Sequence, residues 1–364
     1  MIKEQKKNHW VNWLERIGEQ DLWTANHFIT APPLDGGKAR IPALKTTDVL
    51  GNHVEVRDNE DKSRLLHKVF FHDPPGDPGI NPNYIYPAEK FEYGRISNNH
   101  IGRAIKRLRP HKAPGINGIP NSILINCAKL IIPYLCHIFR ATFDLKHYPK
   151  QWKRYITVAV RKPGKTDYTI ANAYRPIALL DTMAKVLSSC VKDTLEFHTD
   201  RLQILPATQF GGRAGCTTTD SLHLLNHFVK AAWRKKHEVV GLFLDVKGAF
   251  PNAVIPRLVH NMRLEGVPKT ITDWISRQLE GRETVITFDN YTSESIPIDN
   301  GFNQGDCLST FFYRYYNAAQ IRKITKSMQE NRSQDKLALN YADDAMCAAS
   351  APNLQQAAQK IAMM

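Results

Sequence analysis

The segment LALNYADDAMCAA, at residues 337–349, consists of two short apolar runs separated only by the tripeptide Ala342–Asp344. This pattern predicts a tight β-hairpin whose turn carries two adjacent acids, Asp343 and Asp344. An exposed hairpin turn usually has Asn-Gly or Asp-Gly, and a buried turn avoids paired negative charge. The two neighbouring carboxylates therefore indicate that a positive group binds at this turn.

A third acid ends a different apolar run. Residues 239–244, VVGLFL, are mainly β-branched and large apolar side chains and stop abruptly at Asp245, which predicts a buried strand with an acid at its tip. If Asp245 lies beside Asp343 and Asp344, the three carboxylates form an all-oxygen site that suits Mg²⁺ better than zinc. Two such ions about 3.5–4 Å apart would support nucleotidyl transfer to a primer 3′ hydroxyl. Since a single aspartate at a strand end is usually a cap or turn residue, only the combination favours catalysis.

The composition indicates a folded protein with one strongly basic region. In the chain of 364 residues, 42% are hydrophobic and 23% charged, which argues against disorder, collagen and coiled coil. Most of the net charge of +14 comes from residues 101–165, where 14 Lys and Arg stand against one acid, Asp144. Tyr148, Trp152 and Tyr155 are interleaved with these charges, a pattern that favours nucleic-acid binding through counterion release. The alternative is a solvated basic face.

Cysteines and the chain start exclude other classes. The six cysteines are scattered without the spacing of a zinc site, so they are interpreted as reduced thiols. The first ten residues, MIKEQKKNHW, have no apolar signal region, and no run of 18 uncharged apolar residues occurs. We therefore expect an intracellular protein without a membrane span.

The order of elements can be read from periodicity and from Pro and Gly. Residues 1–95 have a short amphipathic start at 10–17 and two punctuated stretches, APPLDGG (31–37) and HDPPGDPGINPNYIYP (72–87), which indicate an extension or linker. From Ser97 on, the pattern predicts helices near 101–108, 121–147 (one or two, well buried), 183–200, 217–235, 252–265, 270–280, 308–329 and after Asn353, a strand at 155–160, and a hairpin at 283–298 around Asp289-Asn290.

Three of these segments resemble motifs of reverse transcriptases. FLDVKGAF (Phe243–Phe250) resembles the first catalytic motif, GFNQGD (Gly301–Asp306) the nucleotide-site loop, and YADD (Tyr341–Asp344) the catalytic hairpin, in the family's order. Four upstream blocks resemble non-LTR retrotransposon enzymes, namely HKAPGINGIP (His111–Pro120), WKRYITVAVRKPGK (Trp152–Lys165), YRPIALL (Tyr174–Leu180) and QFGGRAGCTTTD (Gln209–Asp220). The details AFPNA and GGKARIP (Gly36–Pro42) resemble fungal members of this group.

The resemblance implies an α+β fold, with the fingers and a partial palm of a right-hand polymerase. The palm would be a split βαβ antiparallel sheet in which the Asp245 strand pairs with the Asp343-Asp344 hairpin. The expected domains are 1–95, an extension that follows an endonuclease absent from this sequence; 96–235, fingers with the basic block and the start of the palm; and 236–364, a palm that is incomplete at its C-terminus. The thumb would be absent, which makes the chain a C-terminally truncated fragment.

The resemblance also assigns roles to individual residues. Asp245, Asp343 and Asp344 would hold two Mg²⁺ ions, which Mn²⁺ can replace, with the backbone carbonyl of Val246 assisting one of them. Phe250 would lie under the incoming sugar and exclude a ribose 2′ hydroxyl, which favours deoxynucleotides. Without the resemblance, Phe250 would be interpreted as a core residue.

Further residues would contact the nucleotide and the template. Gln304 and Gly305 would pack against the nascent base pair, and otherwise they are ordinary loop residues before a helix. Arg175 would lie over the triphosphate, a role that suits a planar donor fork, and otherwise it is a surface arginine. Arg161, Lys162 and Lys165 would contact phosphates or template, although each lysine alone is more often simply solvated.

The resulting hypothesis is an RNA-directed DNA polymerase that uses an RNA template, a DNA primer or target, dNTPs and Mg²⁺. Two alternatives stay open: an inactive truncated remnant that at most binds RNA, and an RNA-dependent RNA polymerase, against which Phe250 argues. A nuclear location follows only from how such elements prime at chromosomal targets. A scaffold protein would not explain acids at two separate strand ends.

Overall fold

The computed structural model describes residues 2–15, 40–47, 51–330 and 335–364. The chain divides into two compact units, Met1–Pro42 and Ala43–Met364. The first contains helix α1 (Ile2–Leu14), in which the rings of Trp10 and Trp13 stack at 5.0 Å. The APPLDGG stretch, most of GGKARIP and the end of the predicted amphipathic start lie outside the described residues.

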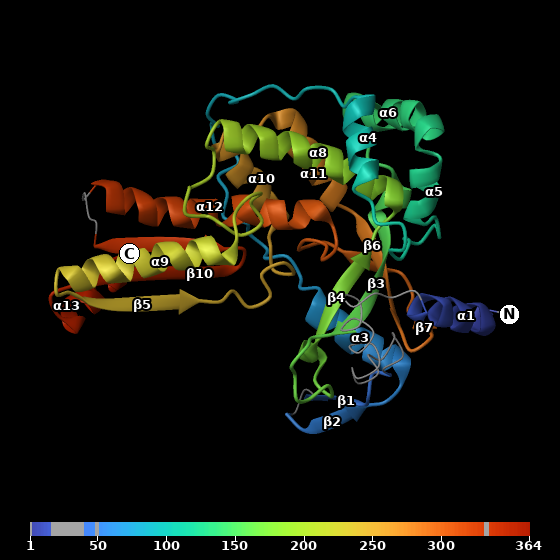
Figure 1. The fold of residues 1–364 in the computed structure, drawn as a ribbon, viewed down its shortest axis with the longest axis horizontal. Helices are drawn as coiled ribbons and strands as arrows, with labels where there is room; N and C mark the ends of the chain where they lie inside the picture. Colours follow the sequence, from blue (N-terminus) through green and yellow to red (C-terminus); the bar gives the residue numbers. More distant parts are fainter. Residues whose placement is uncertain (1, 16–39, 48–50, 331–334) are drawn as a thin grey trace. The chain divides into compact units, whose positions relative to one another are not determined.

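The acid-bearing hairpin belongs to a three-stranded antiparallel sheet of the second unit (Figure 1). Its middle strand is β10 (Asp344–Ala351), which pairs with β9 (Lys336–Tyr341) on one side and with β5 (Glu238–Leu244) on the other. The register pairs Leu244 with Ala345. The hairpin predicted at 337–349 and its pairing with the strand before Asp245 are thus both present.

β5 is not the buried strand that its composition predicts. Leu242, Phe243 and Leu244 are 42%, 72% and 47% exposed. Within the described residues, β5 pairs only with β10, so it is an edge strand with one unpaired side. Periodicity could not reveal this, because an apolar run looks the same in a central strand and at an edge.

Two helices pack against this sheet. α9 (Thr218–Arg234) contacts all three strands, and its Leu225 and Phe228 pack against a buried cluster that includes Leu339 and Met346. α13 (Leu354–Ala362) packs against β5 and β10. The predicted helix after Asn353 is confirmed, because the Asn353 side chain accepts a hydrogen bond from the amide of Gln356 as an N-cap.

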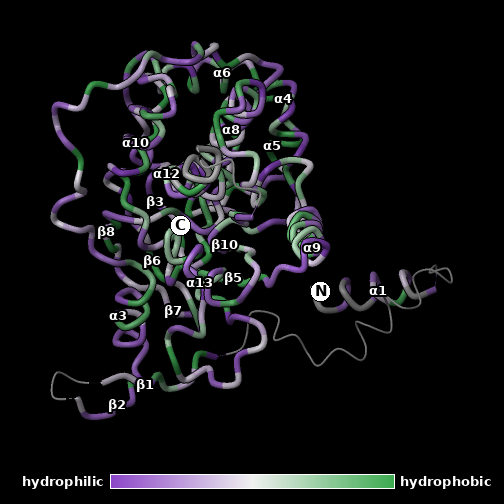
Figure 2. Tube along the Cα trace, turned by 90° about the vertical axis from the view of Figure 1, so that its left-hand side faces the viewer, coloured by the Kyte–Doolittle hydropathy of each residue, from purple (hydrophilic) through white to green (hydrophobic). Residues whose placement is uncertain are grey.

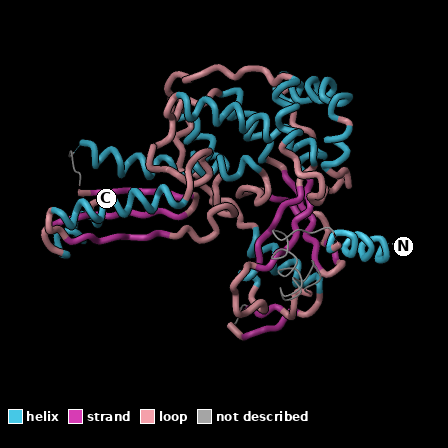
Figure 3. The backbone as a smooth tube through the Cα atoms, viewed as in Figure 1, coloured by secondary structure: helices cyan, strands magenta, loops and turns pink. Residues whose placement is uncertain are grey.

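A second, mixed sheet lies in the same unit and is drawn as a separate group of strands in Figure 3. Its strands follow the order β4 (Tyr174–Leu179), β3 (Arg154–Arg161), β6 (Arg282–Phe288), β7 (Tyr291–Thr292), and β8 (Ile296–Ile298) pairs with β6. β3 and β6 run parallel, joined in addition by a hydrogen bond of 2.7 Å between Thr157 and Thr284. The predicted hairpin turn is confirmed, since Asp289 and Asn290 have φ of 50° and 63°, as a type I′ turn requires.

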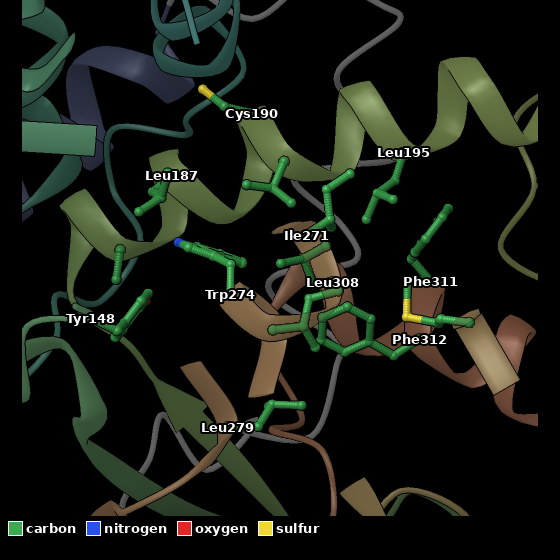
Figure 4. Packing of buried hydrophobic residues seen from close by; sticks show 14 of the residues in the cluster. Tyr148, Leu187, Cys190, Leu195, Ile271, Trp274, Leu279, Leu308, Phe311 and Phe312 are labelled. Carbon is green, nitrogen blue, oxygen red and sulfur yellow. The ribbon is translucent and has the colours of Figure 1, made fainter. Parts of the chain in front are cut away.

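The main core lies among the helices. Trp274 is fully buried there, stacked on Phe143 at 5.2 Å, and its indole N–H donates to the Thr142 hydroxyl at 3.0 Å. Figure 4 shows Trp274 among Leu187, Ile271 and Leu308. Apolar and polar residues alternate along the chain of this unit, as Figure 2 shows. Its further helices are α4 (Asn98–Lys106), α5 (Asn121–Asn126), α6 (Ala128–Asp144), α7 (Lys150–Lys153), the 3₁₀ helix η2 (Ala171–Ala173), α8 (Thr182–Arg201), α10 (Ile255–Leu264), α11 (Lys269–Leu279) and α12 (Cys307–Glu330).

The helices predicted at 121–147 are present as α5 and α6 but are buried on one face only. Phe139 is fully buried, whereas Leu130 and Tyr134 are 69% and 67% exposed. The prediction that both helices are well buried was therefore too strong. α6 contributes only one stripe of side chains to the core, although it has apolar residues on its other faces too.

The second unit begins before the predicted fingers boundary at residue 96. β1 (Leu44–Thr47) and β2 (His53–Val56) form an antiparallel pair, and α3 (Asn59–Phe70) follows with Asp58 as its N-cap. This part of the 1–95 region is therefore folded with the rest of the unit. None of the helices in the described part of the chain is long and apolar enough to cross a membrane.

Candidate active site

Three acids from two chain segments meet at the end of the three-stranded sheet. Asp344 opens β10, and Asp245 directly follows Leu244, whose partner is Ala345, so the two acids are neighbours across the strands. The pKa of Asp344 is raised first by desolvation of its carboxylate and then by the negative charges of Asp343 and Asp245. Like charges thus face each other here, which is the arrangement predicted from the sequence.

This carboxylate group has an oxygen-rich but open geometry. Asp245 and Asp344 are exposed, and Asp343 is half-buried. Among the described residues, no set of three or more His, Cys, Asp or Glu side chains is arranged closely enough to hold a metal ion. The negative charges of Asp343 and Asp245 contribute, after desolvation, to the raised pKa of Asp344, and a hard divalent cation would offset their repulsion. The donor chemistry therefore fits Mg²⁺, although closed ligand geometry is not formed.

Space is available beside these acids. A cavity of about 340 Å³ opens between α9 and the sheet, and its lining includes Asp245 and Asp344 together with apolar side chains such as Leu222, Phe243 and Met346. A substrate group could therefore approach the carboxylates along an apolar wall.

The acidic turn is supported by the segment before α9. The amide of Phe210 donates to the carbonyl of Asn340 at 2.8 Å, which brings Gly211 against the turn. A Cβ atom on Gly211 would lie 1.9 Å from the backbone nitrogen of Ala342. Only glycine therefore fits at this position. From the other side, the Asn317 side-chain amide of α12 donates to the carbonyl of Ala342 at 3.4 Å.

Phe250 connects the acids to the loop at 300–306. Its ring is half-buried and stacks on Tyr313 at 5.4 Å, and the raised pKa of Tyr313 is due first to burial and also to Asp343 and Asp245. The Phe250 carbonyl accepts a hydrogen bond of 2.8 Å from the amide of Phe302. Phe250 is thus partly a core residue, as expected without the resemblance, and its ring contacts Tyr313, on whose pKa two of the acids act.

Gln304 and Gly305 join this loop to the second sheet. The amide of Ala178 in β4 donates to the Gln304 carbonyl at 2.7 Å. Gly305 has φ of +132°, and a Cβ atom there would lie 2.5 Å from the Ala178 carbonyl oxygen. Glycine is therefore required by conformation and by space. In β4, Arg175 lies three residues before Ala178, about 10 Å away along the strand.

The predicted phosphate and template residues lie on the β3–β4 hairpin. The pKa of Lys162 is lowered by burial and by the nearby charges of Lys165 and Arg175, so these three cations form a group. Lys162 also donates to the Asn172 carbonyl at 2.7 Å. Arg161 lies over the ring of Tyr168, 4.7 Å from its centroid. The hairpin therefore has a concentrated positive tip.

The basic block at 101–165 is less unbalanced in space than in sequence. Arg107 forms an ion pair of 2.7 Å with Asp193, and Arg154 pairs with Glu283 at 3.4 Å. Both acids come from outside the block, so part of its charge is neutralised by tertiary contacts. The group at the hairpin tip is the stronger candidate for a polyanion contact.

Two residues at the site were missed in the sequence. The ring of Tyr313 stacks on Phe250, and the charges of Asp343 and Asp245 contribute to its raised pKa. Gly211 has no side chain and so leaves room for the acidic turn. The only available signal for Gly211 was its place in the QFGGRAGC block, and Tyr313 is one aromatic residue among several in α12.

Comparisons with known proteins agree with the motifs. The family model described as reverse transcriptase (RNA-dependent DNA polymerase) matches residues 160–363. The chain is 28% identical to the "RNA-directed DNA polymerase from mobile element jockey" of Drosophila melanogaster, over 68% of this chain and 27% of that protein. It is 30% identical to the "Probable RNA-directed DNA polymerase from transposon BS" of the same species, again over 68% of this chain and 27% of the relative. The chain thus spans about a quarter of the length of these curated relatives.

Among solved structures, an apo telomerase from Candida tropicalis, truncated from its C-terminal domain, is similar at a TM-score of 0.43 and 12% identity. The match covers 67% of this chain and 51% of that one.

Proposed function

Because the chain belongs to the reverse transcriptase (RNA-dependent DNA polymerase) family, with relatives among retrotransposon enzymes such as that of jockey, we propose that it provides the fingers and catalytic palm for RNA-directed DNA synthesis. The observation that carries this proposal is the strand register, which pairs Leu244 with Ala345 and so brings Asp245 beside Asp344 and its neighbour Asp343. The repulsion between these three carboxylates would not be explained by a scaffold function.

In this proposal, Asp245, Asp343 and Asp344 hold Mg²⁺, assisted by the carbonyl of Val246. The bound metal would supply activation of the primer 3′ hydroxyl and neutralise charge on the leaving pyrophosphate. Manganese offers the same oxygen preference and can replace it.

The remaining residues of the proposed site bind and orient the substrates. Phe250 borders the sugar, while Gln304 and Gly305 form a backbone wall beside β4 for the nascent base pair. Arg175 can pair with triphosphate oxygens through its planar fork. Lys162 and Lys165 attract the RNA template, and release of counterions makes that attraction sensitive to salt.

Primer extension on an RNA template tests the function. We expect the chain, given dNTPs and Mg²⁺, to extend an annealed DNA primer, and we expect a chelator to stop extension until Mg²⁺ or Mn²⁺ is restored. Product length on a denaturing gel is the measurement. A preparation with native circular dichroism that binds RNA but never extends a primer would contradict the proposal and favour an inactive RNA-binding remnant.

Replacing Phe250 with valine tests the choice of sugar. The smaller side chain leaves room for a 2′ hydroxyl, so we expect incorporation of rNTPs relative to dNTPs to rise about tenfold or more. The measurement is the ratio of kcat/KM for the two nucleotides. Phe288→Val, which shortens a buried phenylalanine of the second sheet outside the loop and acids, is the matched control and should leave the ratio unchanged. An unchanged ratio in the Phe250 variant would return Phe250 to a purely structural role.

A further inference from the structure

Arg282 is a fully buried arginine that contacts the loop bearing Gln304 and Gly305. It begins β6 and is 2% exposed. Its Nη1 donates to the side-chain oxygen of Asn303 at 2.9 Å. Its Nη2 donates to the carbonyls of Asn300 and Gly301, both at 2.9 Å. Three donations therefore reach three residues within the four-residue stretch at 300–303 of the loop.

The fourth donation fixes the arginine to the end of the preceding helix, α11. Nε donates to the carbonyl of Leu279, the last residue of α11, at 2.6 Å. β6 in turn pairs with β3 in the middle of the second sheet. The guanidinium therefore bridges the loop and the junction of α11 with a strand paired inside the second sheet.

The acceptors of Arg282 are neutral. The pKa of Arg282 is lowered by its burial, while Tyr155, Asp299 and Asp306 act on it only through space in the opposite direction. Burial of a charge is costly unless every donor is satisfied, and a core of the same size could be made from apolar side chains. What the guanidinium offers and an apolar side chain does not is a planar fork that fixes two carbonyls at once.

The loop has further backbone hydrogen bonds within and directly after the stretch that Arg282 contacts. The amides of Gly301 and Phe302 donate to the carbonyls of Ala253 and Phe250 at 3.0 and 2.8 Å. The carbonyl of Gln304 then accepts from Ala178. Arg282 thus holds the middle of a loop that spans from the acid-bearing segment to the β3–β4 hairpin.

We propose that Arg282 is a positioning residue for nucleotide binding, which holds the loop at 300–303 so that Gln304 and Gly305 form a fixed wall for the incoming dNTP. The proposal rests on the proposed function. It goes beyond that function by assigning dNTP affinity to a residue that does not touch the nucleotide.

Two readouts separate this role from general stability. The first is hydrogen exchange of the Gly301 and Phe302 amides, which we expect to be about tenfold faster in Arg282→Met than in the wild type. The second is a split between kinetic constants. We expect KM for dNTP to rise about tenfold or more, with a smaller change in kcat and in RNA affinity. Arg282→Lys keeps the charge but loses the planar fork. Its exchange rates and its KM for dNTP should lie between those of the wild type and those of Arg282→Met.

Arg257 offers a matched control. It donates through Nη2 to the carbonyls of Pro78 and Gly79 at 2.6 and 2.8 Å, so it holds a different loop by the same chemistry. Arg257→Met should leave exchange at Gly301 and Phe302, and KM for dNTP, as in the wild type. If Arg282→Met does not fold, Asn303→Ala removes one of the same contacts without removing the charge and should raise exchange and KM in the same direction.

The outcomes distinguish the two proposals. If exchange at Gly301 and Phe302 is unchanged in the folded Arg282 and Asn303 variants, the positioning role is wrong whatever the polymerase assay gives. The role is also wrong if exchange rises but kcat falls with KM unchanged. If the wild type itself never extends a primer, the proposed function fails, and the exchange measurement alone decides whether Arg282 holds the loop.

Discussion

Asp343→Asn is expected to abolish RNA-templated primer extension while the protein stays folded. The amide keeps the size and shape of the side chain but removes a negative oxygen ligand from the proposed metal site. Since a bound metal supplies several kcal/mol to the transition state, we expect the rate to fall about 10³-fold or more. Single-turnover extension in saturating dNTP and Mg²⁺ is the measurement.

The same variant should lose activity but not stability. The folded pKa of Asp344 is raised, first by partial burial and then by Asp343 and Asp245. The folded chain therefore binds this proton at a pH where the unfolded chain has lost it. The free energy of unfolding falls as pH rises through the interval from the ordinary to the raised pKa, and the loss persists above it. Removing the Asp343 charge lessens this loss, so the thermal midpoint at neutral pH should be equal to or above that of the wild type.

The control for this variant is Asp61→Asn. Asp61 lies on α3, where it is exposed and forms a surface ion pair with Arg64 at 3.1 Å, so its loss should change neither activity nor midpoint noticeably. If Asp343→Asn extends primers at more than about a tenth of the wild-type rate, the loss of rate is far too small for a metal ligand. Asp343 would then lie beside the site without belonging to it.

Gly211→Ala is expected to have the second largest effect. The added methyl group would lie 1.9 Å from the nitrogen of Ala342 and 2.6 Å from the carbonyl carbon of Tyr341, so the backbone of the acidic turn must move. A displacement of about 1 Å at reacting groups can cost about 10²-fold in rate, and overpacking costs about 1–3 kcal/mol of stability. We expect both losses, measured by primer extension and by urea unfolding.

Gly94→Ala provides the comparison. Gly94 has no atom within 4 Å of an added Cβ and no left-handed backbone, so the same chemical change there should be tolerated. Should Gly211→Ala behave like Gly94→Ala in both assays, the turn would have more freedom than its contacts indicate. The support of the acidic turn by the segment at 208–211 would then be wrong.

The family could be predicted from motifs, and the hairpin that carries Asp343 and Asp344 could be predicted from local patterns. The match over residues 160–363 confirms the reverse transcriptase interpretation and disfavours an RNA-dependent RNA polymerase. The roles of Phe250, Arg175 and the lysines stay predictions, as does activity of a chain that spans about a quarter of its relatives. Arg282 could not be found in this way, because an arginine at a strand start usually indicates an exposed residue.

The sequence by itself determined those features whose causes lie within a few residues. The hairpin of Asp343 and Asp344, the type I′ turn at Asp289-Asn290 and the cap at Asn353 follow from alternation, turn chemistry and side-chain capping, so they could be predicted and are present. The tertiary structure alone decided that β5 is an exposed edge, that β3 pairs in parallel with β6 with Arg154 opposite Glu283, and that Arg282 is buried against the loop. The reason is that burial and strand neighbours depend on which distant segments exclude water from each other, and periodicity along one segment contains no information about its partners.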